Sequence, residues 1–106
     1  GYYYLALIYS EQQKYQDAIK LLETAISKPS CNARIYYNLG VLYQMTGQNK
    51  KCEFTFNKGL DVEPGNMDLL YALYSYYLTQ NNIAKANASL EKLKLLYPDN
   101  RQFQQM

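Results

Sequence analysis

The chain has 106 residues, the length of one ordinary domain, and 48% of them are hydrophobic, which argues against a disordered chain. Its 11 basic and 9 acidic residues give a net charge of +2, too small to indicate nucleic acid or an anionic membrane as a partner. There is no histidine, and the two cysteines, Cys31 and Cys52, form no CxxC motif, so the sequence predicts neither a metal site nor a cofactor.

Six helices are expected in chain order, because apolar residues recur at three- and four-residue spacing in successive stretches. The predicted helices are 1–12, 16–28, 33–46, 49–62, 67–80 and 83–96, and a seventh starts near Arg101. The strand-like composition of 2–4 and 52–56 is a competing interpretation. We reject it because the equivalent columns hold Leu22 and Leu90 in clearly helical surroundings.

Turn-forming residues separate the predicted helices. Gly47 and Asn81 follow two of the helices, and both residue types tolerate the left-handed conformation that ends a helix. The stretches 64–66 and 98–100 each begin with proline and end with asparagine. Each stretch is therefore expected to stop one helix and to offer the asparagine side chain as a cap for the next.

The sequence repeats itself when it is shifted by 34 residues, and no gaps are needed. Two of the shared columns are Tyr3, Tyr37 and Tyr71, and Asn32, Asn66 and Asn100. Each period holds two predicted helices. The sequence therefore predicts three helical hairpins, at about 1–32, 33–66 and 67–100, and residues 101–106 start a capping helix or a further repeat.

The middle period has a recognisable spacing of aromatic, small and apolar residues: Tyr36-x2-Leu39-Gly40-x2-Tyr43, then Cys52-x3-Phe56, then Pro64. This spacing resembles the tetratricopeptide repeat family. The resemblance implies an all-α fold, namely one domain over 1–106 built as a right-handed α-α superhelix, a solenoid of three helix-turn-helix repeats. The third repeat departs from the pattern, because Tyr74 and Leu93 are bulky where small residues are usual. Either this hairpin is splayed or these side chains reach a neighbouring element.

The resemblance also implies that the first helix of each hairpin lines a concave groove that binds a peptide or a partner protein. Carried over by column, the expected groove residues are Tyr3, Tyr4 and Leu7, then Arg34, Tyr37, Asn38, Val41, Gln44 and Met45, then Asp68, Tyr71, Ala72, Ser75, Leu78 and Thr79. The tyrosine column either forms contact sites along the groove or fills space between hairpins, and the sequence leaves both possibilities open.

One subgroup of the family grips a terminal carboxylate with lysines, an arginine and asparagines. Only Asn38 matches that pattern here, and Tyr3, Leu7, Asp68 and Ala72 occupy the other positions, so no carboxylate clamp is expected. Cys52 replaces an alanine in a packing column and is expected to be an unreactive buried thiol.

The sequence favours a non-enzymatic scaffold for protein–protein interaction. Two alternatives are self-association through exposed end helices, giving a homo-oligomer, and a docking segment of a larger protein, enzymatic or not. Nucleic-acid binding is not expected, because the groove has little positive charge. The apolar run 2–9 is too short for a membrane span, and the lack of a targeting signal in this segment leaves the compartment open, with the cytoplasm favoured.

Overall fold

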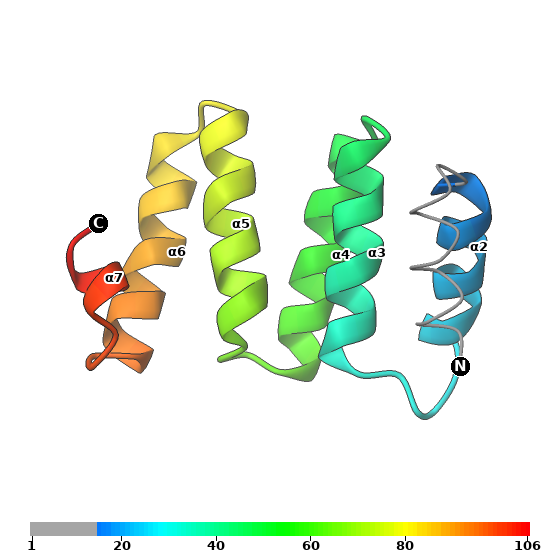
Figure 1. The fold of residues 1–106 in the computed structure, drawn as a ribbon, viewed down its shortest axis with the longest axis horizontal. Helices are drawn as coiled ribbons and strands as arrows, with labels where there is room; N and C mark the ends of the chain where they lie inside the picture. The colour runs from blue at the N-terminus through cyan, green and yellow to red at the C-terminus, as the bar shows by residue number, and fades with distance from the viewer. Residues whose placement is uncertain (1–14) are drawn as a thin grey trace.

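The computed structural model describes residues 15–106, and these residues form helices and connecting turns without any strand. The helices are α2 (Tyr15–Ile26), α3 (Ala33–Met45), α4 (Asn49–Val62), α5 (Met67–Thr79), α6 (Ile83–Leu96) and α7 (Arg101–Gln104). They follow one another in a row along the molecule, with α3–α4 and α5–α6 as successive antiparallel hairpins (Figure 1). The all-α repeat fold is confirmed, and so is the helical reading of 52–56. The predicted helix 1–12 lies outside the described residues.

Asparagine caps start the helices as the repeat columns predict. The side-chain oxygens of Asn32, Asn66 and Asn100 accept hydrogen bonds from the backbone N–H three residues further on, at 3.2, 2.8 and 3.1 Å. Asn82, a residue that sequence analysis did not single out, caps α6 in the same way through Lys85 N–H at 3.2 Å. Each cap satisfies one of the backbone donors that have no partner inside the helix.

The turns inside the two complete hairpins depend on the left-handed backbone conformation. Gly47, between α3 and α4, has a φ of 76°, and Asn81, between α5 and α6, has a φ of 58°. These two residues are the positive-φ positions of residues 15–106, and both were expected from the sequence.

Glycines allow the helices to approach closely. A Cβ atom on Gly40 would lie 2.4 Å from the ring of Phe56, which is fully buried between α3 and α4. A Cβ atom on Gly59 would lie 2.7 Å from Leu69 of the next repeat. The main core therefore continues from hairpin to hairpin, as a solenoid requires.

The third hairpin has its own small core beside α7. Leu70, Leu93 and Phe103 form this second cluster and are 1%, 0% and 3% exposed. Of the two explanations for the bulky Leu93, the second is correct: its side chain reaches the neighbouring α7. Tyr97 joins the same cluster, and its hydroxyl donates a hydrogen bond to the carbonyl of Gly65.

Cys52 is fully buried in the main core, as the packing column predicts. Burial, followed by the nearby charge of Glu53, raises the pKa of the Cys52 thiol to about 12. The thiol therefore stays protonated at neutral pH and behaves as a small apolar side chain.

Candidate functional site

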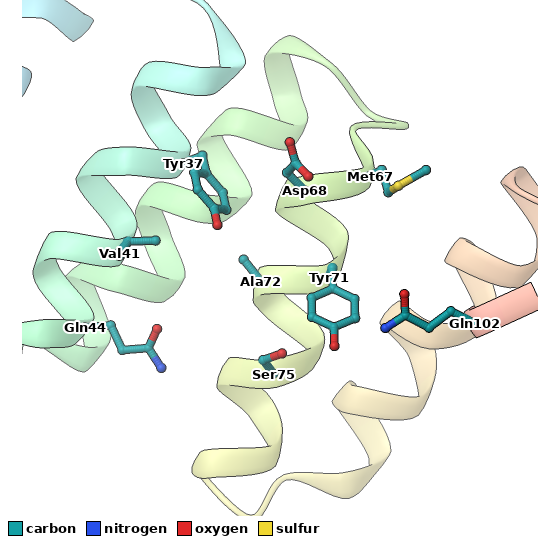
Figure 2. A pocket seen from close by; sticks show the side chains of 9 residues that line it. All are labelled: Tyr37, Val41, Gln44, Met67, Asp68, Tyr71, Ala72, Ser75 and Gln102. Carbon is teal, nitrogen blue, oxygen red and sulfur yellow. The ribbon is translucent and has the colours of Figure 1, made fainter. Parts of the chain in front are cut away.

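A cavity of about 500 Å³ lies between α3 and α5, the first helices of the second and third repeats. Figure 2 shows the side chains of Tyr37, Val41 and Gln44 on one wall and those of α5 on the other. The complete lining is Tyr37, Val41, Gln44, Met67, Asp68, Tyr71, Ala72, Ser75 and Gln102. Gln102 comes from α7 and bounds the cavity on its C-terminal side (Figure 2).

Most of the groove residues expected on α3 and α5 are brought together at this place. Seven line the cavity: Tyr37, Val41, Gln44, Asp68, Tyr71, Ala72 and Ser75. Arg34 and Asn38 line a smaller adjoining cavity of about 250 Å³, together with Tyr37, Asn66 and Asp68. The two cavities share Tyr37 and Asp68, so they form one continuous groove surface. That these residues bind a partner stays a prediction.

A few expected groove residues on α3 and α5 line neither of these cavities. Leu78 and Met45 are 43% and 55% exposed and line neither of the two cavities. Thr79 is also exposed at the end of α5, where its hydroxyl donates a hydrogen bond to the carbonyl of Tyr76. Tyr3, Tyr4 and Leu7 lie outside the described residues.

Two residues of the lining were missed by sequence analysis, namely Met67 and Gln102. The signal for Gln102 was present, because it falls in the same repeat column as Arg34 and Asp68. Met67 precedes Asp68 at the first position of α5, where its long flexible side chain reaches the cavity.

The two described tyrosines of the repeated column pack against the protein and also face the cavity. The Tyr37 ring lies 6.3 Å from the Phe56 ring, and the Tyr71 ring lies 6.0 Å from Tyr74 and 6.2 Å from Phe103. Tyr71 is nevertheless 36% exposed, and Tyr37 is partly exposed. Both rings are therefore held in place by core residues while they present surface to the groove.

A different set of tyrosines joins consecutive repeats. The Tyr43 hydroxyl of α3 donates a hydrogen bond to Glu23 of α2, and the Tyr77 hydroxyl of α5 donates one to Glu53 of α4 at 2.8 Å. Burial, then the bond to Glu53, raises the pKa of Tyr77 to about 12, and the pKa of Tyr43 is also raised, chiefly by burial. These phenols stay protonated at neutral pH and serve as structural donors.

The groove side chains are mostly uncharged. Residues 15–106 contain no group of three or more side chains able to hold a metal ion. None of the helices in that range is both long enough and apolar enough to cross a bilayer. The groove itself offers phenol, amide, hydroxyl and aliphatic groups, with Arg34 and Asp68 as its charged members.

Solved structures with a similar fold cover nearly the whole chain. The type III secretion translocator chaperone SycD of Yersinia enterocolitica matches with a TM-score of 0.83 and 20% identity over 98% of this chain and 79% of its own. PcrH in complex with the chaperone-binding region of PopB matches with a TM-score of 0.81 and 16% identity, over 96% and 82%. A tetratricopeptide repeat protein of Parabacteroides merdae matches with 0.84 and 24%, over 93% of this chain and 39% of that protein.

Comparison with curated protein sequences gave no match. Family models do match the sequence in three consecutive segments. A model described as TPR repeat matches residues 6–47, and two models described as tetratricopeptide repeat match residues 33–66 and 69–100. These segments follow the 34-residue period, and the structure shows stacked helical hairpins over the same residues from 15 onward. The chain therefore belongs to the tetratricopeptide repeat family, with three tandem repeats.

Proposed function

We propose that this chain is a protein-interaction scaffold that binds a peptide segment of a partner in the groove between α3 and α5. The observation that carries the proposal is the cavity of about 500 Å³ in which Tyr37 and Tyr71 present partly exposed, well-supported rings. Such rings bury a large area on binding and lose little rotamer entropy, and their hydroxyls suit a peptide backbone.

The comparisons support this proposal through the fold. One similar structure is SycD in complex with a peptide of the translocator YopD, and PcrH is also found in complex with the chaperone-binding region of PopD. At 20% and 15% identity these likenesses show only that the same scaffold holds peptides in other proteins. The groove residues of this chain therefore need their own test.

The groove is tested with a library of random peptides displayed on phage and selected on the immobilised chain. Selected peptides are then titrated against Tyr37→Ala and Tyr71→Ala by fluorescence anisotropy. Each substitution is expected to lower the affinity by about tenfold, since a well-packed aromatic contact contributes about 1–2 kcal/mol.

The control for this test is Phe54→Ala on α4. Phe54 is 64% exposed and lines neither groove cavity, so its loss should leave the affinity unchanged. Circular dichroism of all variants checks that the helices are retained. Equal affinity of wild type, Tyr37→Ala and Tyr71→Ala would contradict the proposed groove.

Self-association is the second candidate function that the sequence suggested. The observation that favours it is the apolar surface at the end of α6, where Leu95 and Leu96 are 81% and 49% exposed. A contiguous exposed apolar patch, unlike single exposed apolar residues, is typical of a protein–protein contact surface. Analytical ultracentrifugation over a wide concentration range decides this point, and a monomer at every concentration excludes it.

A further inference from the structure

Two further cavities lie on the side of α3 and α5 that faces away from the groove. One, of about 490 Å³, is lined by α2, α3 and α4, and we call it the α2–α4 pocket. The other, of about 240 Å³, is lined by α4, α5 and α6, and we call it the α4–α6 pocket.

The helical period places these pockets and the groove on opposite sides of the same helices. The α2–α4 pocket is lined by Leu39 and Tyr43 of α3. The groove is lined by Tyr37, Val41 and Gln44 of that helix. At about 3.6 residues per turn, the two sets point in roughly opposite directions. The molecule therefore has a pocketed face that is separate from the groove.

The two pockets are copies of one another in successive repeats. Every position in the lining of the α2–α4 pocket except Lys50 recurs, 34 residues later, in the lining of the α4–α6 pocket. In the first pocket, Lys51 Nζ lies 5.7 Å from the centre of the Tyr43 ring. In the second, Lys85 Nζ lies 5.6 Å from the centre of the Tyr77 ring. Comparing the copies shows which side chains the stacking of repeats does not require.

Two side chains of α4 distinguish the larger pocket from the smaller one. Phe54 and Lys50 stand where the third repeat has Ala88 and Ala84. Because alanine is sufficient at both columns in the third repeat, stacking does not account for the two larger residues. Phe54 lines the α2–α4 pocket and is nevertheless 64% exposed. Its ring therefore offers apolar area that a partner can bury.

Lysines surround the exposed ring of Phe54. Lys50 and Lys51 line the same pocket, and Lys58 Nζ lies 5.4 Å from the centre of the Phe54 ring. The lining contains one carboxylate among the described residues, that of Glu23, and it already accepts a hydrogen bond from a tyrosine of α3. The charge around the pocket is therefore mainly positive.

The lysines of the α2–α4 pocket differ from their counterpart in the next repeat. Lys85 forms an ion pair with Glu53 at 3.4 Å. The column of Glu53 holds Ile19 in the preceding repeat, so Lys51 lacks the equivalent carboxylate. Neither Lys50 nor Lys51 has a carboxylate within ion-pair distance among residues 15–106. Their ammonium groups are available to carboxylates of a partner.

We propose that this pocketed face is a second docking surface, and that it binds an acidic segment of a partner protein. An apolar side chain of the segment enters the α2–α4 pocket against Phe54, and the flanking carboxylates pair with Lys50 and Lys51. The apolar contact supplies most of the affinity, while the lysines favour acidic segments and repel basic ones. This surface binds its segment whether or not the groove is occupied.

The test is a subtractive selection with random peptides displayed on phage. Phage that bind the variant Phe54→Ala/Lys50→Ala are removed first, and the remainder are selected on the wild-type chain. This variant carries the residues that the third repeat has at the same columns, so it is expected to fold. The enriched peptides should combine a large apolar residue with neighbouring aspartate or glutamate. If no peptide is enriched, or if the enriched peptides are not acidic, the proposal is overturned.

The enriched peptides are then titrated by fluorescence anisotropy against Lys50→Glu/Lys51→Glu. This variant should bind about tenfold more weakly, because two attractions become repulsions. Acidic residues suit the first turn of α4, so the helix should be retained, and circular dichroism checks this. The matched control is Lys20→Glu/Lys28→Glu, which changes the net charge equally at two exposed lysines that line neither pocket. Equal weakening by both variants would show a response to net charge alone and overturn the proposal.

Two further outcomes separate this surface from the groove and from a lipid surface. Tyr37→Ala and Tyr71→Ala should leave the affinity for the enriched peptides unchanged, and a loss of affinity there would place these peptides in the groove. Vesicles of phosphatidylserine and phosphatidylcholine serve as the lipid probe in a sedimentation assay. Sedimentation of the wild-type chain but not of Lys50→Glu/Lys51→Glu, with no peptide enriched, would show that the lysines bind anionic lipid instead of a protein.

Discussion

At the scale of single residues, small side chains set the distances between the helices. The backbone of α3 at Gly40 is so close to α4 that an added Cβ would lie 2.4 Å from the Phe56 ring. The repeat columns predicted this small position correctly. The columns also placed Tyr37 in the groove, where it lines the cavity, but they did not predict that the Tyr43 hydroxyl donates a hydrogen bond to Glu23 of the preceding repeat.

The Gly40→Ala variant is expected to be less stable than wild type. Alanine gains roughly 1 kcal/mol of helix propensity over glycine, but the clash with the buried Phe56 ring costs about 1–3 kcal/mol and forces the hairpin apart. Urea denaturation followed by circular dichroism measures the difference. The control is Gly65→Ala, whose added Cβ would meet Leu96 at an ordinary 3.6 Å. Equal stability of both variants would show that the close approach is unimportant.

At the scale of elements, helix boundaries were predictable because they depend on local chemistry. Prolines, the left-handed turn residues Gly47 and Asn81 and the asparagine column placed the described helix ends within a few residues of the sequence prediction. The environment of Leu93 was less predictable, since it depends on α7, a single turn formed by Arg101–Gln104. Contacts with an element so short leave almost no periodic signal in the sequence.

The Asn66→Ala variant is expected to weaken α5. Asn66 accepts a hydrogen bond from Leu69 N–H at 2.8 Å, and loss of such a cap costs about 1 kcal/mol. For a domain of this size, that corresponds to a fall of about 4–8 °C in the melting temperature. Asn66→Ser keeps an acceptor oxygen at the same place and should retain most of the stability in a thermal scan. If the serine variant has the same melting temperature as the alanine variant, loss of the cap is not the cause of the lower stability.

At the scale of the whole molecule, the groove is a product of stacking rather than of any one repeat. Its walls come from α3 and α5, and α7 adds Gln102. The repeat columns therefore predicted most of the residues that line the cavity. Leu78 lines neither cavity and is 43% exposed, and its place in a binding surface stays a prediction. Gln102 was missed because the sequence analysis predicted a helix starting near Arg101 but assigned none of its residues to the groove.

The end of the described solenoid is expected to depend on one aromatic anchor. Phe103 is 3% exposed and packs with Leu70 and Leu93, so Phe103→Ala should cost about 3–5 kcal/mol in the third hairpin. Hydrogen exchange should then show faster opening of α6 than of α4, because each hairpin is stabilised mainly by its neighbours. Leu95→Ala, at a position 81% exposed, is the control and should change little. Uniform destabilisation of all hairpins would contradict this prediction.

The capping asparagines also separate folding from selectivity. In α3, α5 and α7 the capping asparagine comes two residues before a residue that lines a groove cavity, namely Arg34, Asp68 or Gln102. One side chain therefore secures the helix start, and a different one faces the groove. The side chain at the cavity-lining position can therefore change in charge or size while the asparagine cap still holds the backbone. If the proposed function holds, single substitutions at 34, 68 and 102 would change which partners the groove accepts and leave the stacked architecture intact.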